Sequence, residues 1–163
     1  MIMEIIKITQ TNDALTRLVA LFRVELRSYK GITSKPNIEA AREEMEEYLA
    51  AGFPVFAAII DGEYAGYVVC RVDSEVVWVE SIFVKEEYRR HGVASALHSK
   101  AEEIAASYGE DTVYNYVHPN NHRMIGFLRK RGYTVLNLIE IRKPYAGEET
   151  TQIIKVGDHE FDY

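Results

Sequence analysis

The most specific signal for chemistry in this chain is the stretch of residues 89–94, which reads RRHGVA. It follows a run that predicts a strand and begins a run that predicts a helix, so consecutive backbone N–H groups meet at a helix N-terminus. With the helix dipole, such groups form a pocket for phosphate, and Gly92 uncovers them. A solvated basic turn is the competing interpretation. The stretch lacks the Gly-Lys-Ser/Thr sequence of a P-loop and has one glycine where a dinucleotide fingerprint needs three.

Two further side chains, Glu80 and Cys70, could take part in chemistry. Glu80 is the one charged residue of an apolar run over residues 76–84, VVWVESIFV. A carboxylate in such a setting can work as a general base, whereas isolated strand carboxylates more often have a structural role such as an ion pair. Cys70, the only cysteine, lies within a predicted strand with no neighbouring general base. It is expected to be a small buried apolar group rather than a nucleophile.

Hydrophobic periodicity and turn residues predict the elements that hold these side chains. One helix follows a cap among residues 11–13 and stops at Gly31, and a second is capped by Asn37 and stops at Gly52. The remaining predictions are strands over residues 3–9, 55–60, 64–72, 76–84, 112–117 and 133–142, helices over 93–108 and 121–131, and a terminal hairpin over 152–156 and 159–162.

The order of these elements, βααβββαβαβ, predicts a mixed α/β fold in which an antiparallel meander leads into one βαβ crossover. A crossover makes its two strands parallel, so the strands over residues 76–84 and 112–117 are expected side by side. The chain has no repeat, linker or low-complexity stretch. We therefore expect one domain over residues 1–145, with residues 146–163 as a C-terminal tail or hairpin of the same domain.

Composition narrows the class of protein. The chain has 163 residues, 47% of them hydrophobic, which is enough for a core without disulfides or metal. The net charge of −6 argues against broad binding to nucleic acid and favours cationic partners such as amines. No apolar run approaches the ~20 residues that span a bilayer, and neither a signal-peptide pattern nor metal-binding spacing occurs. A cytoplasmic protein without a metal or membrane partner is expected.

The stretch that begins at Arg89 resembles the signature of the GNAT superfamily of N-acetyltransferases. That signature is Arg or Gln, two residues, Gly, one residue, and Gly or Ala, and it is matched by Arg89, Gly92 and Ala94. Upstream, residues 79–89 (VESIFVKEEYR) look like the family's strand and its entry into the loop. Downstream, Asn120-Asn121 and residues 127–133 (FLRKRGY) are similar to the family's asparagine and its closing motif. The resemblance covers residues 55–133 and leaves the tail uncovered.

The resemblance implies acetyl-CoA as the acyl donor. In this family the strand over residues 76–84 splays from its parallel neighbour, and the pantetheine arm pairs with the exposed backbone as an added strand would. Backbone N–H groups of the loop would hold the pyrophosphate, and the basic residues Lys85, Arg89, Arg90 and His91 would offset the negative charge of the protein locally. The cofactor-binding residues that the resemblance implies are Ile82, Phe83, Val84, Arg89, Arg90, His91, Gly92, Val93, Ala94, Ser95 and Asn121.

For catalysis, the resemblance implies Glu80 as the general base, because an acidic residue lies at this strand position in members that resemble diamine acetyltransferases. A base is needed because an alkyl ammonium of pKa ~10.4 is neutral at pH 7 only about once in 10^3.4. Family members often carry a tyrosine as general acid where this chain has Leu128. Candidate replacements are Ser81, Tyr114, Tyr116, Tyr133 and an ordered water.

We therefore expect direct transfer of an acetyl group to the primary amine of a small cationic or amino-acid-like acceptor. The alternatives are a protein N-terminus or lysine as the acceptor, and a CoA-binding sensor domain without turnover, which Leu128 would suit. The acidic run over residues 43–47 (EEMEE) is either a solvated helix face or a surface that steers a cationic amine. The family often dimerises, so pairing of the tail with a second chain, in a homodimer, stays open.

Overall fold

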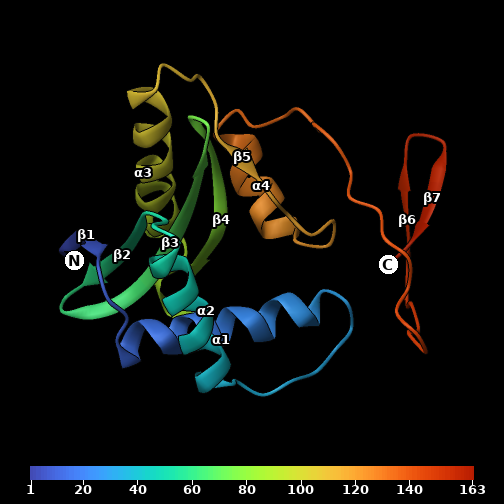
Figure 1. The fold of residues 1–163 in the computed structure, drawn as a ribbon, viewed down its shortest axis with the longest axis horizontal. Coiled ribbons are helices and arrows are strands. Elements are labelled where there is room, and N and C mark those ends of the chain that lie inside the picture. Colours follow the sequence, from blue (N-terminus) through green and yellow to red (C-terminus); the bar gives the residue numbers. More distant parts are fainter. The chain divides into compact units, whose positions relative to one another are not determined.

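The structure is a computed structural model that describes residues 1–163. The chain forms two compact units, one of residues 1–25 and 35–116 and the other of residues 26–34 and 117–163. The first contains a five-stranded sheet in the order β1-β2-β3-β4-β5, and the second contains the two-stranded sheet β6-β7 (Figure 1). The predicted mixed α/β class is confirmed.

The helices and strands follow the predicted order over most of the chain. The strands are β1 (Met3–Ile8), β2 (Val55–Ile60), β3 (Glu63–Asp73), β4 (Val76–Val84), β5 (Tyr114–Asn115), β6 (Ile153–Val156) and β7 (His159–Asp162). The helices are α1 (Asp13–Ser28), α2 (Ile38–Ala50), the short 3-10 helix η1 (Glu86–Tyr88), α3 (Val93–Ser107) and α4 (His122–Lys130). All of these helices are too short or too polar to cross a membrane.

Caps and turns explain where several elements begin. The Leu15 N–H donates to the side chain of Asn12 at 2.9 Å, and the Ala40 N–H donates to that of Asn37 at 3.0 Å, so both helices start at a side-chain cap. The β2–β3 turn contains Asp61 and Gly62 at φ +49° and +86°. Positive φ at both central residues matches the twist of a two-residue hairpin, as the Asp-Gly sequence predicts.

The sheet of the first unit is covered on both faces. Tyr67 and Val69 belong to a buried cluster with residues of α1 and α2, among them Leu15 and Met45. Side chains alternate along a strand, so the fully buried Cys70 points to the opposite face, where α3 lies against β2, β3 and β4. The three layers hold the end of β4 and the start of α3 in place.

The register between β3 and β4 is interrupted at one position. Val69 pairs with Ser81 and Cys70 pairs with Val79, which leaves Glu80 without a partner on β3. Glu80 is therefore the extra residue of a β-bulge. Because directly opposed residues share a face, Val79 points with Cys70 to the α3 side and Ser81 points with Val69 to the side of α1 and α2.

Parallel pairing of β4 with the strand after α3 is confirmed, but that strand is shorter than the predicted 112–117. Only Trp78↔Tyr114 and Val79↔Asn115 pair. The Asn115 amide donates to the Val113 carbonyl at 3.2 Å, a local bond that competes with a ladder. The strand therefore ends where this side chain bonds back to its own backbone.

The predicted strand over residues 133–142 is wrong, because no strand forms there. Its apolar side chains do not alternate as a one-faced strand requires, since residues 135 and 136 are both apolar and so are residues 138 and 139. A strand with this pattern needs cover on both faces. Val135 is 87% exposed and Leu136 is 70% exposed.

Candidate active site

The loop after β4 and the first turn of α3 form the site that the sequence predicts for phosphate. No backbone N–H of residues 90–95 donates a hydrogen bond within the protein, and the first helical bond runs from the Ala96 N–H to the Gly92 carbonyl at 3.0 Å. Gly92 is the N-cap, provides no side-chain cap and has φ +78°. A Cβ on Gly92 would meet nothing within 4 Å. These free N–H groups beside open space are suited to an anion.

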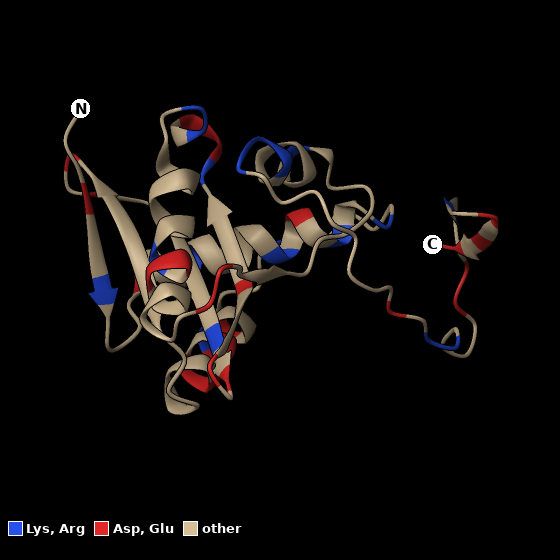
Figure 2. Cartoon of the chain, turned by 90° about the horizontal axis from the view of Figure 1, so that it is seen from above, with Lys and Arg blue, Asp and Glu red and all other residues tan.

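Basic and acidic residues lie close together in this loop (Figure 2). Some of their charges are paired within the protein. Arg89 Nη2 lies 3.0 Å from Glu25 Oε1, while Arg89 Nε donates to the Val84 carbonyl at 2.8 Å. Lys85 Nζ lies 2.6 Å from Glu87 Oε1. Of the four basic residues that the sequence offered for the pyrophosphate, Arg90 and His91 are therefore the exposed ones without an ion-pair partner. Arg89 instead ties the loop to α1 and to the end of β4.

The end of β4 has one open backbone edge. Ile82, Phe83 and Val84 pair with β3 on one side, and beyond Val79 no strand pairs with the other side. Gly66 on β3 lets the two strands approach, since a Cβ there would lie 2.6 Å from the Phe83 carbonyl oxygen. An extended chain with amide groups can add to such an edge as a strand does. The residues predicted to meet the acyl donor's arm thus lie on a free edge.

Glu80, at the bulge, lies beside the fork between β4 and β5. Arg71 Nε donates to Glu80 Oε2 at 3.2 Å, and the Arg71 guanidinium stacks over Trp78 at 4.3 Å from the ring centroid. Arg71 Nη2 also donates to the Tyr116 hydroxyl at 3.2 Å. An ion pair of this kind is what a structural role for Glu80 would predict, and it is present. Glu80 Oε1 takes no part in it, so one oxygen of the carboxylate stays available to a substrate proton.

A second carboxylate, Glu44 on α2, belongs to the same region. The Tyr48 hydroxyl donates to Glu44 Oε1 at 2.8 Å, and Arg23 Nη1 lies 3.7 Å from Glu44 Oε2, which is buried without a hydrogen bond. Burial raises the pKa of Tyr48, and the negative charges of Glu44 and Glu80 raise it further. Two carboxylates therefore act on one hydroxyl. Sequence reasoning placed Glu44 only within an acidic run, although its spacing of four from Tyr48 puts both on one helix face.

The candidate general acids are held in different ways. Ser81 Oγ lies 2.8 Å from the Tyr67 hydroxyl, and both residues are buried. Burial raises the pKa of Tyr67 well above the usual value for tyrosine, although its hydrogen bond with Ser81 acts in the opposite direction. The rings of Tyr114 and Trp78 are in contact, with their centroids 5.5 Å apart. The Tyr116 hydroxyl accepts a hydrogen bond from Arg71. No single hydroxyl stands out as the acid.

Cys70 has no nucleophilic character in this structure. It is fully buried, and burial raises the pKa of its thiol to about 12. A thiol that stays protonated at neutral pH is a poor nucleophile. The sequence prediction of a buried apolar role for this residue is confirmed.

Asn121 and Leu128 belong to the second unit, where each has a local role. Asn121 is the N-cap of α4 and accepts from the Met124 N–H at 3.1 Å. Leu128 is buried on α4 and 7% exposed. His118, which shares an alternating pattern with Tyr114 and Tyr116, lies with Nδ1 2.6 Å from the Tyr163 hydroxyl. Burial lowers the pKa of His118, and the charge of Lys30 lowers it further.

Comparison with known proteins finds acetyltransferases both by a family model and by sequence identity. The sequence model of the acetyltransferase (GNAT) family matches residues 18–133. An N-alpha-acetyltransferase of Sulfurisphaera tokodaii is 29% identical over 129 residues, which are 69% of this chain and 72% of that protein.

Two solved structures show the same fold. The aminoglycoside N-acetyltransferase AAC(6')-Iy in complex with CoA has a TM-score of 0.65 and 23% identity, over 86% of this chain and 94% of that one. The PaiA N-acetyltransferase from Thermoplasma acidophilum in complex with coenzyme A has a TM-score of 0.65 and 21% identity, over 80% of this chain and 89% of that one.

Proposed function

Because the chain belongs to the acetyltransferase (GNAT) family, with acetyl-CoA as the acyl donor, we propose that it acetylates the primary amine of a small cationic or amino-acid-like acceptor. The acceptor class is supported by a pair of carboxylates. Glu44 accepts from the Tyr48 hydroxyl at 2.8 Å, Glu80 keeps Oε1 outside its ion pair with Arg71, and the charges of both carboxylates raise the pKa of Tyr48. An ammonium group is the ligand that two carboxylates attract. The transfer is direct, without an acyl-enzyme.

The donor would be held mainly by backbone. The free N–H groups of residues 90–95 suit the pyrophosphate, and the open edge of Ile82, Phe83 and Val84 suits the amide-bearing arm. Arg90 adds positive charge at the surface, and the exposed His91 lies next to it in sequence. Only the family motif supports a role for Asn121 in donor binding, because its side-chain oxygen already caps α4.

Catalysis begins with removal of a proton from the acceptor ammonium. Glu80 Oε1 would take that proton, directly or through a water, and so free the nitrogen lone pair. The nitrogen then bonds to the acetyl carbon, the carbon–sulfur bond breaks and CoA leaves as a thiolate. The nitrogen loses its second proton as the amide forms, and the departing thiolate or the solvent takes that proton. A thiol pKa of ~8.5 makes the thiolate a tolerable leaving group. The absence of a general acid at position 128 should therefore lower the rate less than the absence of a general base would. Cys70, buried and protonated, offers no covalent path.

A peptide N-terminus is the second candidate acceptor. The relative from Sulfurisphaera tokodaii is an N-alpha-acetyltransferase, and an N-terminal amine presents the same nitrogen nucleophile. It differs in basicity, since an α-amine has a pKa of ~7.7 to 8.0 and needs a base less than an alkyl amine does. A protein lysine or a sensor without turnover are the further alternatives.

The acceptor class is tested by the release of CoA thiol from acetyl-CoA in the presence of different amines. We expect the highest kcat/KM with di- and polyamines or amino-acid amides. Peptides with a free N-terminus should be slower, and peptides whose only amine is a lysine slower still. A higher rate with N-terminal peptides would assign the second candidate. Tight acetyl-CoA binding with no turnover on any amine would assign the sensor.

A matched pair of variants links this result to Glu44. Glu44→Gln should raise the KM for a cationic amine by roughly tenfold, about 1.4 kcal/mol, because one of the two carboxylates loses its charge. Glu46→Gln removes the same charge from an exposed position of the same helix and should leave the KM unchanged. Equal effects of both variants would reduce the role of Glu44 to long-range attraction.

We also propose that a second copy of the chain covers residues 135–141. Val135, Leu136, Leu138, Ile139 and Ile141 are 87%, 70%, 68%, 42% and 66% exposed. The backbone of residues 134–141 has no hydrogen bond within the chain. Apolar side chains and free backbone groups in one extended segment favour pairing with another chain.

Light scattering during gel filtration tests this pairing. The protein should elute with twice the mass of one chain, and Leu138→Glu should shift it toward the monomer because burial of a carboxylate in an apolar interface is costly. Ile32→Glu changes an isolated apolar residue that is 49% exposed and should leave the dimer intact. A wild-type monomer at all concentrations would contradict the proposal.

A further inference from the structure

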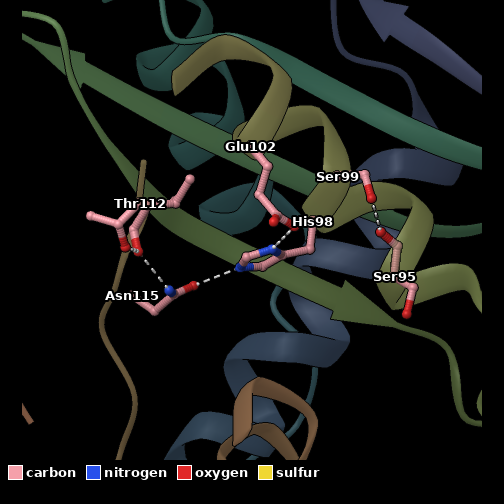
Figure 3. A network of polar contacts seen from close by, with 7 residues as sticks. Ser95, His98, Ser99, Glu102, Thr112 and Asn115 are labelled. Carbon is pink, nitrogen blue, oxygen red and sulfur yellow. Dashed lines mark hydrogen bonds and ion pairs between the residues drawn. The ribbon is translucent and has the colours of Figure 1, made fainter. Parts of the chain in front are cut away.

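A buried polar network around His98 connects the phosphate-binding helix with the fork between β4 and β5 (Figure 3). His98 lies on α3, one turn after the free N–H groups, and its ring is fully buried. Its Nε2 is 3.0 Å from Asn115 Oδ1, and its Nδ1 is 3.0 Å from Glu102 Oε1. Asn115 is the last residue of β5 that pairs with β4. One ring thus touches the strand at the point where it leaves the sheet.

The hydrogen-bond roles in this network follow from its oxygens. The Asn115 Nδ2 donates to the Val113 carbonyl at 3.2 Å, so Oδ1 is the atom that faces His98. An amide oxygen and a carboxylate oxygen only accept. Both ring nitrogens therefore lie at hydrogen-bond distance from an oxygen, Asn115 Oδ1 at one and Glu102 Oε1 at the other. A buried ring nitrogen without a hydrogen bond destabilises the fold by more than that hydrogen bond would stabilise it, so such bonds are kept.

The residue that follows β5 is held by a second contact. Tyr116 accepts from Arg71, which in turn holds Glu80. Asn115, the last residue of β5, is thus held by His98 of α3, and Tyr116, the first residue after β5, is held by Arg71 of β3. Only the Asn115 anchor reaches the helix that begins at the phosphate site. A shift of this anchor would change the gap between β5 and the open edge at Ile82–Val84.

We propose that His98 is a positioning residue for acyl transfer. Its hydrogen bond to Asn115 sets where β5 parts from β4, and with it the width of the slot that receives the acyl-bearing arm of the donor. The inference rests on the proposed mode of donor binding. It concerns a residue that touches neither substrate nor the reacting atoms, and it acts through β5.

Two ligands separate this role from a general loss of stability. Coenzyme A carries both the pyrophosphate and the arm, whereas ADP carries a pyrophosphate on adenosine without the arm. His98→Phe keeps a ring of similar size and removes both hydrogen bonds. We expect the Kd of coenzyme A and the KM of acetyl-CoA to rise roughly tenfold, and the Kd of ADP to change by less than about twofold. Titration calorimetry or NMR shifts give both values.

Three further variants complete the test. Asn115→Ala breaks the same bond from the strand and should give the same split, so it decides the question if His98→Phe does not fold. Glu102→Gln keeps an acceptor oxygen and should retain coenzyme A affinity. Glu103→Gln, exposed on the same helix and paired with Lys100, is the surface control.

The outcomes distinguish this inference from the proposed function. Equal losses for ADP and coenzyme A, or a lowered Tm with both affinities intact, would overturn the role of His98. A wild-type protein that binds neither ligand and acetylates no amine would overturn the proposed function instead.

Discussion

Gly92→Glu is expected to weaken acetyl-CoA binding by at least about a hundredfold while the fold survives. The N–H groups of residues 90–95 have no partner in the protein, and charge-assisted hydrogen bonds are each worth ~1.5 to 3 kcal/mol. A side chain at position 92 points into the open space beside these groups, and its carboxylate repels a phosphate. Calorimetric titration with acetyl-CoA measures the loss.

The matched control is Gly109→Glu, at the other end of α3. Gly109 has φ +80° against +78° for Gly92, and a Cβ on either would meet nothing within 4 Å. Both variants therefore impose the same backbone strain and the same charge. Both should lower the Tm by a similar amount, and only Gly92→Glu should lose affinity. Unchanged binding by Gly92→Glu would remove the phosphate site from this loop.

Glu80→Gln is expected to lower turnover at neutral pH by ~10² to 10⁴ with little change in acetyl-CoA affinity. The amide keeps the shape of the side chain and cannot take the ammonium proton. Part of the rate should return at high pH, because more of an amine of pKa ~10.4 is already neutral there. Rates measured against pH for both proteins, beside their melting temperatures, test this.

The ion pair with Arg71 requires its own control. Arg71→Gln removes the same pair from the other side and keeps the carboxylate, so it should retain most of the turnover. The pair is partly exposed, with side chains 27% and 28% exposed, and its contribution to stability is expected to be at most about 1 kcal/mol. Similar rate losses in both variants, without recovery at high pH, would make Glu80 a structural partner of Arg71.

Local chemistry explains why much of the fold was predictable. Asn12 and Asn37 cap their helices, and Asp61-Gly62 turns the hairpin, through contacts with residues at most four positions away. The run RRHGVA predicted a phosphate site because a glycine-led helix start leaves its N–H groups free whatever surrounds it. The site of the bulge was not predictable, since a bulge depends on how Val69 and Cys70 of β3 align with β4.

The partners of the charged residues escaped prediction for a related reason. Arg89 meets Glu25 across 64 positions of sequence, and Arg71 meets Tyr116 across 45. No periodicity reports on such distances. Likewise His98 and Asn115 each look ordinary in sequence, one on a helix and one on a strand. Only the crossover that brings α3 over β5 makes them neighbours.

The sequence by itself determined the element order as far as α4, the parallel crossover and the free N–H groups at the start of α3. Caps, turns and a helix start depend on backbone geometry over a few residues, and a helical connection between two strands makes them parallel. The tertiary structure decided which charges remain unpaired, that Glu80 is the extra residue of a bulge and how far β5 follows β4. These depend on contacts between distant segments, whose energies involve burial and register. For residues 133–142 the local pattern predicted a strand that the chain does not form, because a strand needs a partner and cover that its own sequence cannot supply.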